Sequence, residues 1–461
     1  MIDSNIKDRL LAEPTSPRFS RTWEYLRTVF GSLLALVFVV ALFTVADAML
    51  ADGTFATARN LRTVAVQTCV VAVGALGMTL IIISGGIDLS AGTALSLAAT
   101  VLAWGLREDV AFRLTHGDNF ITASTKLERA YQTLSAAENA SDTVKAEHAR
   151  AEVEQRREKL HAILTAKRAE AQWSVEHATD EKQRQRWARS LAALDQKIAR
   201  LADESVPFRS DRAWESGVYN SRWSAVTAVA LGVGSGMAAG FLNGLLISSL
   251  RVAPFIVALG AMTIYLGLGN LLSGSVPIRP SMEYHVPDWL ARITRNTPDA
   301  LYAGFPYGVW LALGLALVLA IVLRYHVFGR RVFALGSNEA TARLCGVNVA
   351  AYKVAVYTLA GLFIGIAGVY QFSRLTVGNP QSGLGLELRI IAAVVIGGGS
   401  LNGGRGTVIG TLTGAAIMAV IASGCTQLGV ENPVQDILLG AIIVGAVTLD
   451  HARQRRWSSD S

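Results

Sequence analysis

The sequence has few cysteines and lacks the short motifs that bind nucleotides or metals. Its three cysteines, Cys69, Cys345 and Cys425, are too scattered for a disulfide framework. None of the eight lysines follows a glycine, so the Gly-Lys-Ser/Thr end of a phosphate-binding loop is absent. No HExxH pair or GxSxG turn occurs either. We therefore expect no enzyme activity, and assign no catalytic residue, cofactor or metal site.

Charge is also scarce outside one block of the chain. Charged residues make up 17% of the 461 residues against 51% hydrophobic residues, which is too apolar for an ordinary soluble protein. The stretch 107–222 alone carries 20 basic and 19 acidic residues. We therefore expect an all-α, polytopic transmembrane helical bundle in two parts, 1–106 and 223–461, interrupted by a charged insert at 107–222.

Apolar stretches long enough to cross a membrane recur along both parts. A helix needs roughly 20 apolar residues to span the hydrocarbon core, and about ten candidates occur. The third and eighth candidates are short. The expected passes are 31–50, 64–84, 92–106, 223–246, 254–273, 307–323, 353–372, 388–399, 407–423 and 434–449.

Basic residues gather in three segments between or beside these passes, and cytoplasmic loops are typically enriched in Lys and Arg. Even numbers of passes separate the three segments, so both termini are expected in the cytoplasm of a multi-pass inner (plasma) membrane protein. Three passes precede the insert, which is therefore expected outside. We interpret the net charge of +7 as an orientation signal and not as nucleic-acid binding. The segments are the N-terminal tail (Lys7, Arg9, Arg18, Arg21, Arg27), the loop 324–352 with Lys353, and the C-terminal tail (Arg453, Arg455, Arg456).

The insert has the composition of a helical hairpin. From Thr125 to about Glu204 it lacks proline and glycine and is rich in strong helix formers. Apolar residues at 187, 191, 194, 198 and 201 follow the spacing of a coiled-coil seam, with a turn expected near His177–Asp180. The hairpin is either an arm that contacts a partner or a tolerated, solvated insertion.

Glycine is abundant, at 43 residues, and many glycines are four residues apart. In a bilayer this spacing lets helix backbones approach closely. It predicts close helix packing in the bundle. The clearest sets are Gly232/Gly236/Gly240/Gly244, Gly361/Gly365 and Gly406/Gly410/Gly414.

Four stretches, in order and over nearly the whole chain except the insert, resemble the permease subunits of ribose-type ATP-binding-cassette importers of monosaccharides. They are GMTLIIISGGIDLS at 77–90, GLL at 244–246 leading to PFIVALG at 254–260, FGRRVFALGSNEATARLCGVN at 328–348, and IAAVVIGGGSLNGGRG at 391–406. The insert departs from that pattern.

The resemblance implies a permease that forms the path for a monosaccharide such as ribose. It also implies four partners: a second copy of the permease, a cytoplasmic ATP-binding-cassette ATPase, an extracytoplasmic sugar-binding protein and membrane lipid. No nucleic acid is expected as a partner. The sugar itself is not specified by the sequence.

The basic loop 324–352 matches the part of such permeases that couples to the ATPase. The residues 338–344 can form two turns of helix, with Asn338 as the N-cap and Glu339 at the positive end of the helix dipole. The alternative is a surface helix at the lipid headgroups, with basic side chains against anionic lipid. The candidate coupling residues are Arg330, Arg331, Asn338, Glu339, Arg343 and Gly346.

The segment Gly85-Gly86-Ile87-Asp88 separates two apolar runs, where a carboxylate usually marks a functional site or a helix end. Broken helices in transporters often lie beside the substrate path, although capping of the next helix near Ala91 explains Asp88 equally well. The candidate path residues are Gly85, Gly86, Asp88, Asn243 and Asn270.

Two other functions compete with the importer permease. A secondary transporter would need ionisable residues within its spans for ion coupling, and apart from Asp88 the expected spans are almost free of acids. A membrane-anchored scaffold that presents a coiled-coil arm would leave the loop 324–352 unexplained.

Overall fold

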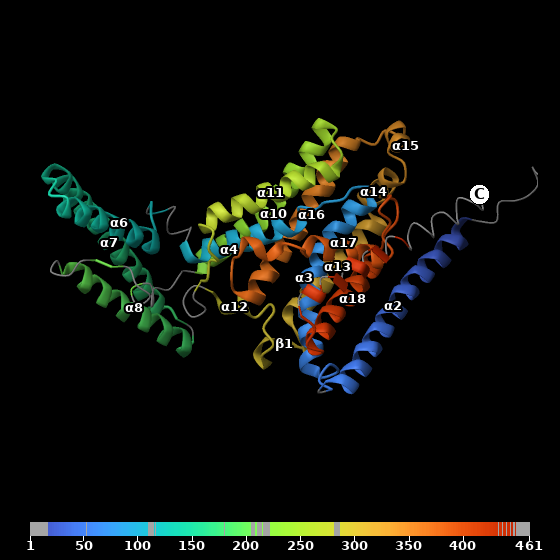
Figure 1. Ribbon diagram of the computed structural model, residues 1–461, viewed down its shortest axis with the longest axis horizontal. Helices are drawn as coiled ribbons and strands as arrows, with labels where there is room; N and C mark the ends of the chain where they lie inside the picture. Colours follow the sequence, from blue (N-terminus) through green and yellow to red (C-terminus); the bar gives the residue numbers. More distant parts are fainter. Residues whose placement is uncertain are drawn as a thin grey trace, which may run out of the picture.

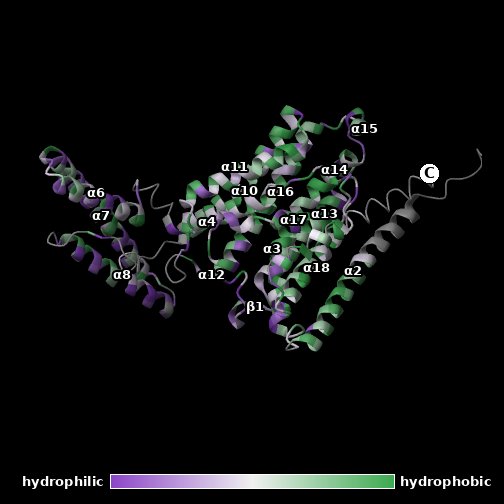
Figure 2. Cartoon of the chain, in the orientation of Figure 1, coloured by the Kyte–Doolittle hydropathy of each residue, from purple (hydrophilic) through white to green (hydrophobic). Residues whose placement is uncertain are grey.

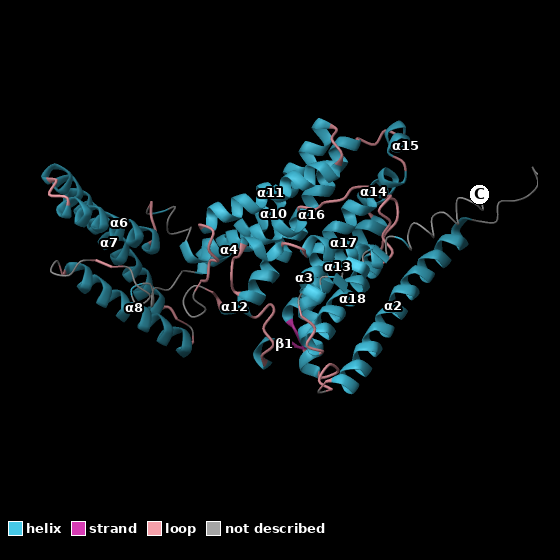
Figure 3. Ribbon diagram, in the orientation of Figure 1, coloured by secondary structure: helices cyan, strands magenta, loops and turns pink. Residues whose placement is uncertain are grey.

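The computed structural model describes residues 17–51, 53–108, 115, 117–178, 180–203, 208–209, 214, 222–280 and 286–431, with scattered further residues up to 448. Most of these residues are helical (Figure 3). The described strands are two short ones that pair antiparallel, β1 (Leu301–Tyr302) and β2 (Phe305–Pro306). The predicted all-α fold is therefore confirmed.

Seven helices in the described part of the chain are long and apolar enough to cross a membrane. The eighth expected pass, α17, is short, at 11 residues, whereas the third, α4, is longer than expected, at 18 residues. The expected tenth pass, 434–449, is described only in part, and the basic side chains of the C-terminal and N-terminal tails lie outside the described residues. The helices of the bundle are α2 (Pro17–Leu50), α3 (Ala58–Ile83), α4 (Ala91–Glu108), α10 (Arg222–Leu250), α11 (Pro254–Ser273), α13 (Tyr307–Tyr325), α16 (Val349–Leu375), α17 (Leu386–Ile396) and α18 (Val408–Gln427).

Helix α3 forms the centre of the bundle and α2 its edge. In the apolar window of α3, 89% of residues are buried, against 6% in that of α2. Helix α3 packs against α16, α18, α17 and α13, whereas α2 lies along α18 on the outside (Figure 1). The outer surface of α2 is apolar, with Leu34 and Phe38 more than 60% exposed (Figure 2). Such a surface suits contact with lipid chains.

The glycine spacing predicted close packing, and α10 and α16 pack through glycines from both helices. A Cβ atom built on Gly236 would lie 2.5 Å from the Cα of Gly365, and one on Gly361 would lie 2.9 Å from the Cα of Gly240. No side chain larger than hydrogen fits at these positions without moving a backbone. The prediction of close helix contact is confirmed here.

The insert contains three described helices, α6 (Phe120–Asn139), α7 (Thr143–Glu176) and α8 (Glu181–Ala202). The turn expected near His177–Asp180 lies between α7 and α8. A second turn at Ala140–Asp142 was not predicted, so the insert has one helix more than a hairpin. At this turn Ser141 has a φ of 54°, and the Asp142 side chain accepts a hydrogen bond from the Lys145 backbone N–H at 3.1 Å, which caps α7.

The insert has its own hydrophobic core. Trp187, Leu194 and Leu201 of the predicted seam are at most 5% exposed, and they share a cluster with Leu127 and Leu160. A buried carboxylate, Asp118, is bonded to the ammonium groups of two lysines from α6 and α7 (described below). The three helices extend to one side of the bundle in Figure 1.

Short elements mark the two ends of the bundle. At the start of α3, the Arg62 guanidinium donates to the Gly304 carbonyl oxygen at 3.0 Å, in the turn between β1 and β2. At its end, α3 meets α14 (Val327–Ser337), which leads into α15 (Glu339–Leu344). The remaining elements are α12 (Asp288–Ala291) and the 3-10 turns η1 (Pro298–Ala300) and η2 (Pro380–Gly383).

The insert lies at the end of the bundle that is opposite α15. Arg186 of α8 forms an ion pair with Asp288 of α12 at 3.6 Å, and α12 belongs to the same connection as β1 and β2. In Figure 1, α15 is at the top of the bundle, and α12 and β1 are below it.

Candidate functional site

Helix α3 ends where the sequence predicted a break. Its last residue is Ile83, Gly85 adopts a φ of +83°, and α4 begins at Ala91. A left-handed conformation is cheap only for glycine, so Gly85 lets the chain leave the helix within one residue. Gly86 lies against a side chain of α16, since a Cβ built on it would be 2.5 Å from the Tyr357 hydroxyl oxygen.

Asp88 lies in this break, buried to 2% exposure. Its Oδ1 accepts hydrogen bonds from the Ser90 backbone N–H at 2.8 Å and from the Ser90 hydroxyl at 2.6 Å. Its Oδ2 is 3.3 Å from Nδ2 of Asn243, which also donates to the Ser90 hydroxyl oxygen at 2.8 Å. The carboxylate thus supports the start of α4 through Ser90, one residue before the predicted Ala91, and joins α4 to α10.

A tyrosine from a third helix completes the cluster. The Tyr265 hydroxyl of α11 lies 2.8 Å from Oδ1 of Asn243 and 2.9 Å from the Ala239 carbonyl oxygen. With its oxygen facing Tyr265, the Asn243 amide directs its NH₂ group to Asp88 and Ser90. The break, α10 and α11 are therefore tied together by buried polar contacts, which hold helices firmly in an apolar environment. We call Asp88, Ser90, Asn243 and Tyr265 the Asp88 cluster.

The structure brings together most of the predicted path residues. Gly85, Gly86, Asp88 and Asn243 meet at the break, whereas Asn270 lies near the end of α11 and makes no described side-chain bond to the cluster. The prediction missed Tyr265 and Tyr357. A tyrosine hydroxyl within an apolar span usually has a polar partner, and that was the available signal.

The predicted short helix in the loop 324–352 is present as α15. Asn338 caps it by accepting a hydrogen bond from the Thr341 backbone N–H at 3.0 Å. Gly346 follows its end with a φ of +80°, and the Val347 N–H returns to the Ala342 carbonyl oxygen at 3.1 Å. This arrangement is a typical glycine-terminated helix end.

Glu339 at the start of α15 connects it to α16. Its Oε2 is 2.8 Å from Nζ of Lys353, and its Oε1 accepts from the Arg343 guanidinium at 3.2 Å. The hydrogen bond from Lys353, with the positive charges of both side chains, outweighs partial burial and lowers the pKa of Glu339. The carboxylate therefore stays ionised at neutral pH.

The two predicted arginines of α14 bond within the loop. Arg331 donates to the Tyr352 hydroxyl oxygen at 2.7 Å, and its guanidinium lies 5.5 Å from the centre of the Tyr352 ring. Arg330 donates to the Tyr325 carbonyl oxygen at 3.2 Å. Both arginines are exposed, and so are most residues of α15. This end of the bundle thus presents a polar, largely basic surface.

The loop touches the helix break through backbone atoms. A Cβ on Gly336, at the end of α14, would collide with the Ile83 carbonyl oxygen at the end of α3. The Gly404 N–H donates to that same oxygen at 2.8 Å, and a Cβ on Gly403 would lie 2.9 Å from the Cα of Gly85. The glycine-rich turn at 397–406 therefore packs against the break and α14. We call Gly85, Gly336, Gly403 and Gly404 the glycine junction.

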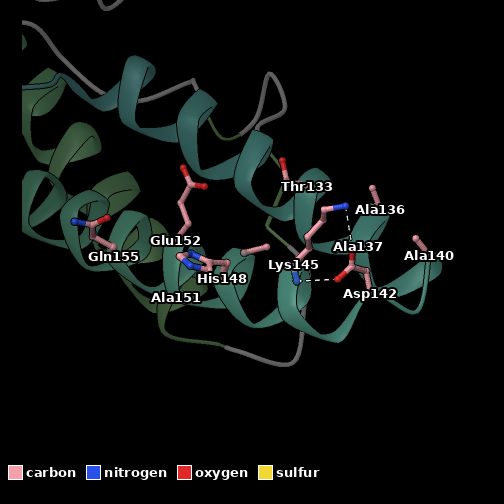
Figure 4. Close-up of a pocket in the computed structure, with 11 residues that line it drawn as sticks. Thr133, Ala136, Ala137, Ala140, Asp142, Lys145, His148, Ala151, Glu152 and Gln155 are labelled. Atoms are coloured by element: carbon pink, nitrogen blue, oxygen red, sulfur yellow. Dashed lines mark hydrogen bonds and ion pairs between the residues drawn. The ribbon is translucent and has the colours of Figure 1, made fainter.

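A pocket on the insert is separate from these features. It lies between α6 and α7 and is lined by Ala137, Asp142, Lys145 and His148 among others (Figure 4). None of the predicted site residues lines it. It belongs to the folding of the insert and gives no sign of the substrate path.

Comparisons with known proteins identify the family of the chain. Residues 213–447 match the family described as branched-chain amino acid transport system / permease component. The ribose import permease protein of Escherichia coli K12 is 35% identical over 232 residues, which cover 50% of this chain and 70% of that protein. The L-arabinose ABC transporter permease protein of Azospirillum brasilense is 34% identical over 271 residues, covering 58% and 77%.

A third relative is the ribose import permease protein of Bacillus subtilis, 36% identical over 238 residues, which cover 52% of this chain and 72% of that protein. No solved structure matches the chain. The matches confirm the predicted resemblance, and they describe a transporter component, not an enzyme. The chain belongs to this family of membrane permease components of ATP-binding-cassette transport systems.

Proposed function

We propose that the chain is the permease of an ATP-driven importer and forms the path for a monosaccharide delivered by an extracytoplasmic binding protein. The relatives described above are named for ribose and L-arabinose, and others for fructose and galactose. The similarity to permeases named for sugars carries the proposal. The Asp88 cluster supports it, because a buried polar group at a helix break often lies beside the substrate path of a transporter.

The energy for transport comes from a separate cytoplasmic ATPase, which docks on α14 and α15. The chain has no phosphate-binding loop, and α15 is a short, capped helix with exposed, charged side chains at the end of the bundle. Arg330, Arg331, Asn338, Glu339, Arg343 and Gly346 are the proposed coupling residues. The opposite end, which bears the insert, faces outward in this proposal, and both termini face the cytoplasm.

Two copies of the permease form the complete path, and lipid covers their outer surface. Exposed apolar residues are concentrated on α2, α10, α11 and α13, which fits lipid contact. The insert at 107–222 is a separate helical unit, between membrane parts 1–106 and 223–461. Its outward position places it where a binding protein approaches.

Sugar uptake by cells tests the proposed function. Deleting the gene should abolish ATP-dependent uptake of at least one of labelled D-ribose, L-arabinose, D-fructose and D-galactose, and the intact gene should restore it. Labelled L-leucine is the comparison, because the family description names branched-chain amino acids. Loss of leucine uptake with normal uptake of all four sugars would refute the monosaccharide assignment. Uptake that survives loss of ATP but stops when the proton gradient collapses would indicate a secondary transporter.

A further inference from the structure

One buried polar group beside the Asp88 cluster has no partner. The Tyr357 residue of α16 is 2% exposed, and its hydroxyl forms no hydrogen bond in the described part of the chain. The other tyrosines buried in the bundle are bonded: Tyr265 as described above, and Tyr370 to the Gly308 carbonyl oxygen at 2.6 Å. Burying an unpaired hydroxyl is costly, so its retention needs an explanation.

The Tyr357 hydroxyl points at the break. It lies against Gly86, two residues before Asp88, where even a Cβ atom would be only 2.5 Å from its oxygen. The Asp88 Oδ2 atom can accept a further hydrogen bond, because its one described bond is the long contact of 3.3 Å from Asn243. A movement of α16 relative to the break that brings the hydroxyl to Oδ2 would allow the tyrosine to donate to Asp88.

The coupling loop is placed to cause such a movement. Lys353, bonded to Glu339 of α15, is four residues before Tyr357 and therefore on the same side of α16. On the other side of the break, the glycine junction holds α14 against the end of α3. Any shift of α14 and α15 thus acts on both the helix that carries the hydroxyl and the break that carries the carboxylate.

We propose that Tyr357 is a positioning residue of the transport cycle, whose hydroxyl, unpaired here, donates to Asp88 in a second arrangement that α15 produces through Lys353. The bond would hold the break in that arrangement while the cargo passes. This inference rests on the proposed function, since it needs a driven movement of the coupling loop. It assigns a role to a residue outside the coupling loop and outside the Asp88 cluster.

Removing only the Tyr357 hydroxyl should leave the stability of the permease unchanged or higher but should slow transport. In Tyr357→Phe the purified permease should unfold at the same temperature as the wild type or higher, because an unpaired buried polar atom is lost. Uptake per molecule of permease should nevertheless fall about tenfold or more, since a hydrogen bond to a charged group is lost in the second arrangement. If Tyr357 had only a structural role, uptake would not fall while the unfolding temperature stayed the same or rose.

Tyr370→Phe is the matched control on the same helix. It removes a hydroxyl that is bonded here, so it should lower the unfolding temperature while uptake per molecule changes less than about twofold. In Asp88→Asn, adding Tyr357→Phe should reduce uptake much less than it does with Asp88 present, because the acceptor has already been altered. The amide side chain introduced by Asp88→Asn keeps an oxygen for the two Ser90 bonds.

The uptake probe is whichever labelled sugar the wild type carries among D-ribose, L-arabinose, D-fructose and D-galactose. Wild-type uptake of none of them would refute the proposed function, and the inference with it. Normal wild-type uptake together with unchanged uptake by Tyr357→Phe would overturn the inference alone. Loss of uptake in proportion to a lowered unfolding temperature would also overturn it, as would equal effects of Tyr357→Phe with and without Asp88.

Discussion

Glu339 and Lys353 join the short helix α15 to the first turns of α16, with 2.8 Å between Oε2 and Nζ. The contact connects an exposed element at the end of the bundle to a helix that reaches its centre. An exposed ion pair of this kind adds little to the stability of the fold. Its importance here is geometric, because it fixes how α15 lies on the bundle.

Reversing the charge at Glu339 should weaken binding of the ATPase more than it weakens the fold. Glu339→Lys places a third positive charge beside Lys353 and Arg343 and loses a favourable helix-dipole contact of about 0.3–1 kcal/mol. We expect the variant to insert normally and to retain less ATPase on co-purification. Glu147→Lys, at an exposed position of the insert, is the matched control and should retain all of it. Equal retention by both variants would contradict the coupling role.

Gly346→Leu should loosen the end of α15 without a steric clash. Nothing lies within 4 Å of the position of an added Cβ, so the cost comes from the backbone φ of +80°. A left-handed conformation costs a non-glycine residue about 1–2 kcal/mol. Hydrogen exchange of the α15 amides should therefore be faster in the variant. Unchanged exchange would mean that the helix end does not depend on this glycine.

The glycine junction should tolerate no side chain at Gly336. A methyl group there collides with the Ile83 carbonyl oxygen and would lie 2.7 Å from the Gly404 nitrogen. We expect Gly336→Ala to lower sugar uptake at least about tenfold, a loss of roughly 1.4 kcal/mol. Gly314→Ala on α13 has open space around it and should transport normally. Normal uptake by the Gly336 variant would show that α14 and the break do not have to stay in contact.

Native and introduced cysteines can test which end of the bundle is cytoplasmic. Cys345, beside α15, is exposed, whereas Cys69 and Cys425 are buried. We expect an impermeant maleimide added to spheroplasts to leave Cys345 unlabelled until the membrane is opened. In a Cys345→Ser background, a cysteine at the exposed Ala151 position of the insert should react from outside. The opposite labelling pattern would reverse the proposed orientation.

The buried carboxylate of the insert should make its stability depend on pH. The Asp118 side chain is 1% exposed, and its two oxygens lie 2.9 Å from the ammonium groups of Lys126 and Lys159. Burial raises the pKa of Asp118, but the hydrogen bonds and charges of the two lysines outweigh it, so the pKa is lowered. Its contribution is thus complete above the unfolded pKa of about 4 and is lost as pH falls toward the lower folded value.

Hydrogen exchange of α6 and α7 in the full chain can measure this effect. Asp118→Asn should speed exchange relative to the wild type at pH 7, and the difference should shrink as pH falls below about 4, after correction for intrinsic exchange rates. Glu147→Gln, at an exposed position, should change exchange little at either pH. A difference that grows on acidification would contradict the assigned charge state.

Local sequence signals predicted those features that depend on neighbouring residues. The Asn338 cap and the glycine after α15 depend on side chains and φ angles within a few residues. The second turn of the insert had such a signal too: Ser141-Asp142 before α7 is a helix-start pattern, but the segment lacks the glycine or proline that usually marks a turn.

Contacts between helices that are distant along the chain could not be predicted from the sequence. Asp88 and Asn243 were each recognised as polar residues among apolar ones, but nothing in the spacing indicates that they meet across 155 residues. The same holds for Tyr265 and Tyr357, which look like ordinary aromatic residues of apolar helices. Their roles depend on the crossing of α10, α11 and α16 at the break, which packing decides.

Reconstitution tests the central claim most directly. The permease should be placed in proteoliposomes with the ATPase and the binding protein of the proposed importer. Uptake of labelled D-ribose, L-arabinose, D-fructose and D-galactose should then be measured with and without ATP. The account predicts uptake of at least one sugar that requires ATP and all three proteins. Absence of uptake of all four sugars by an assembled complex that hydrolyses ATP, or equal uptake without ATP, would contradict it.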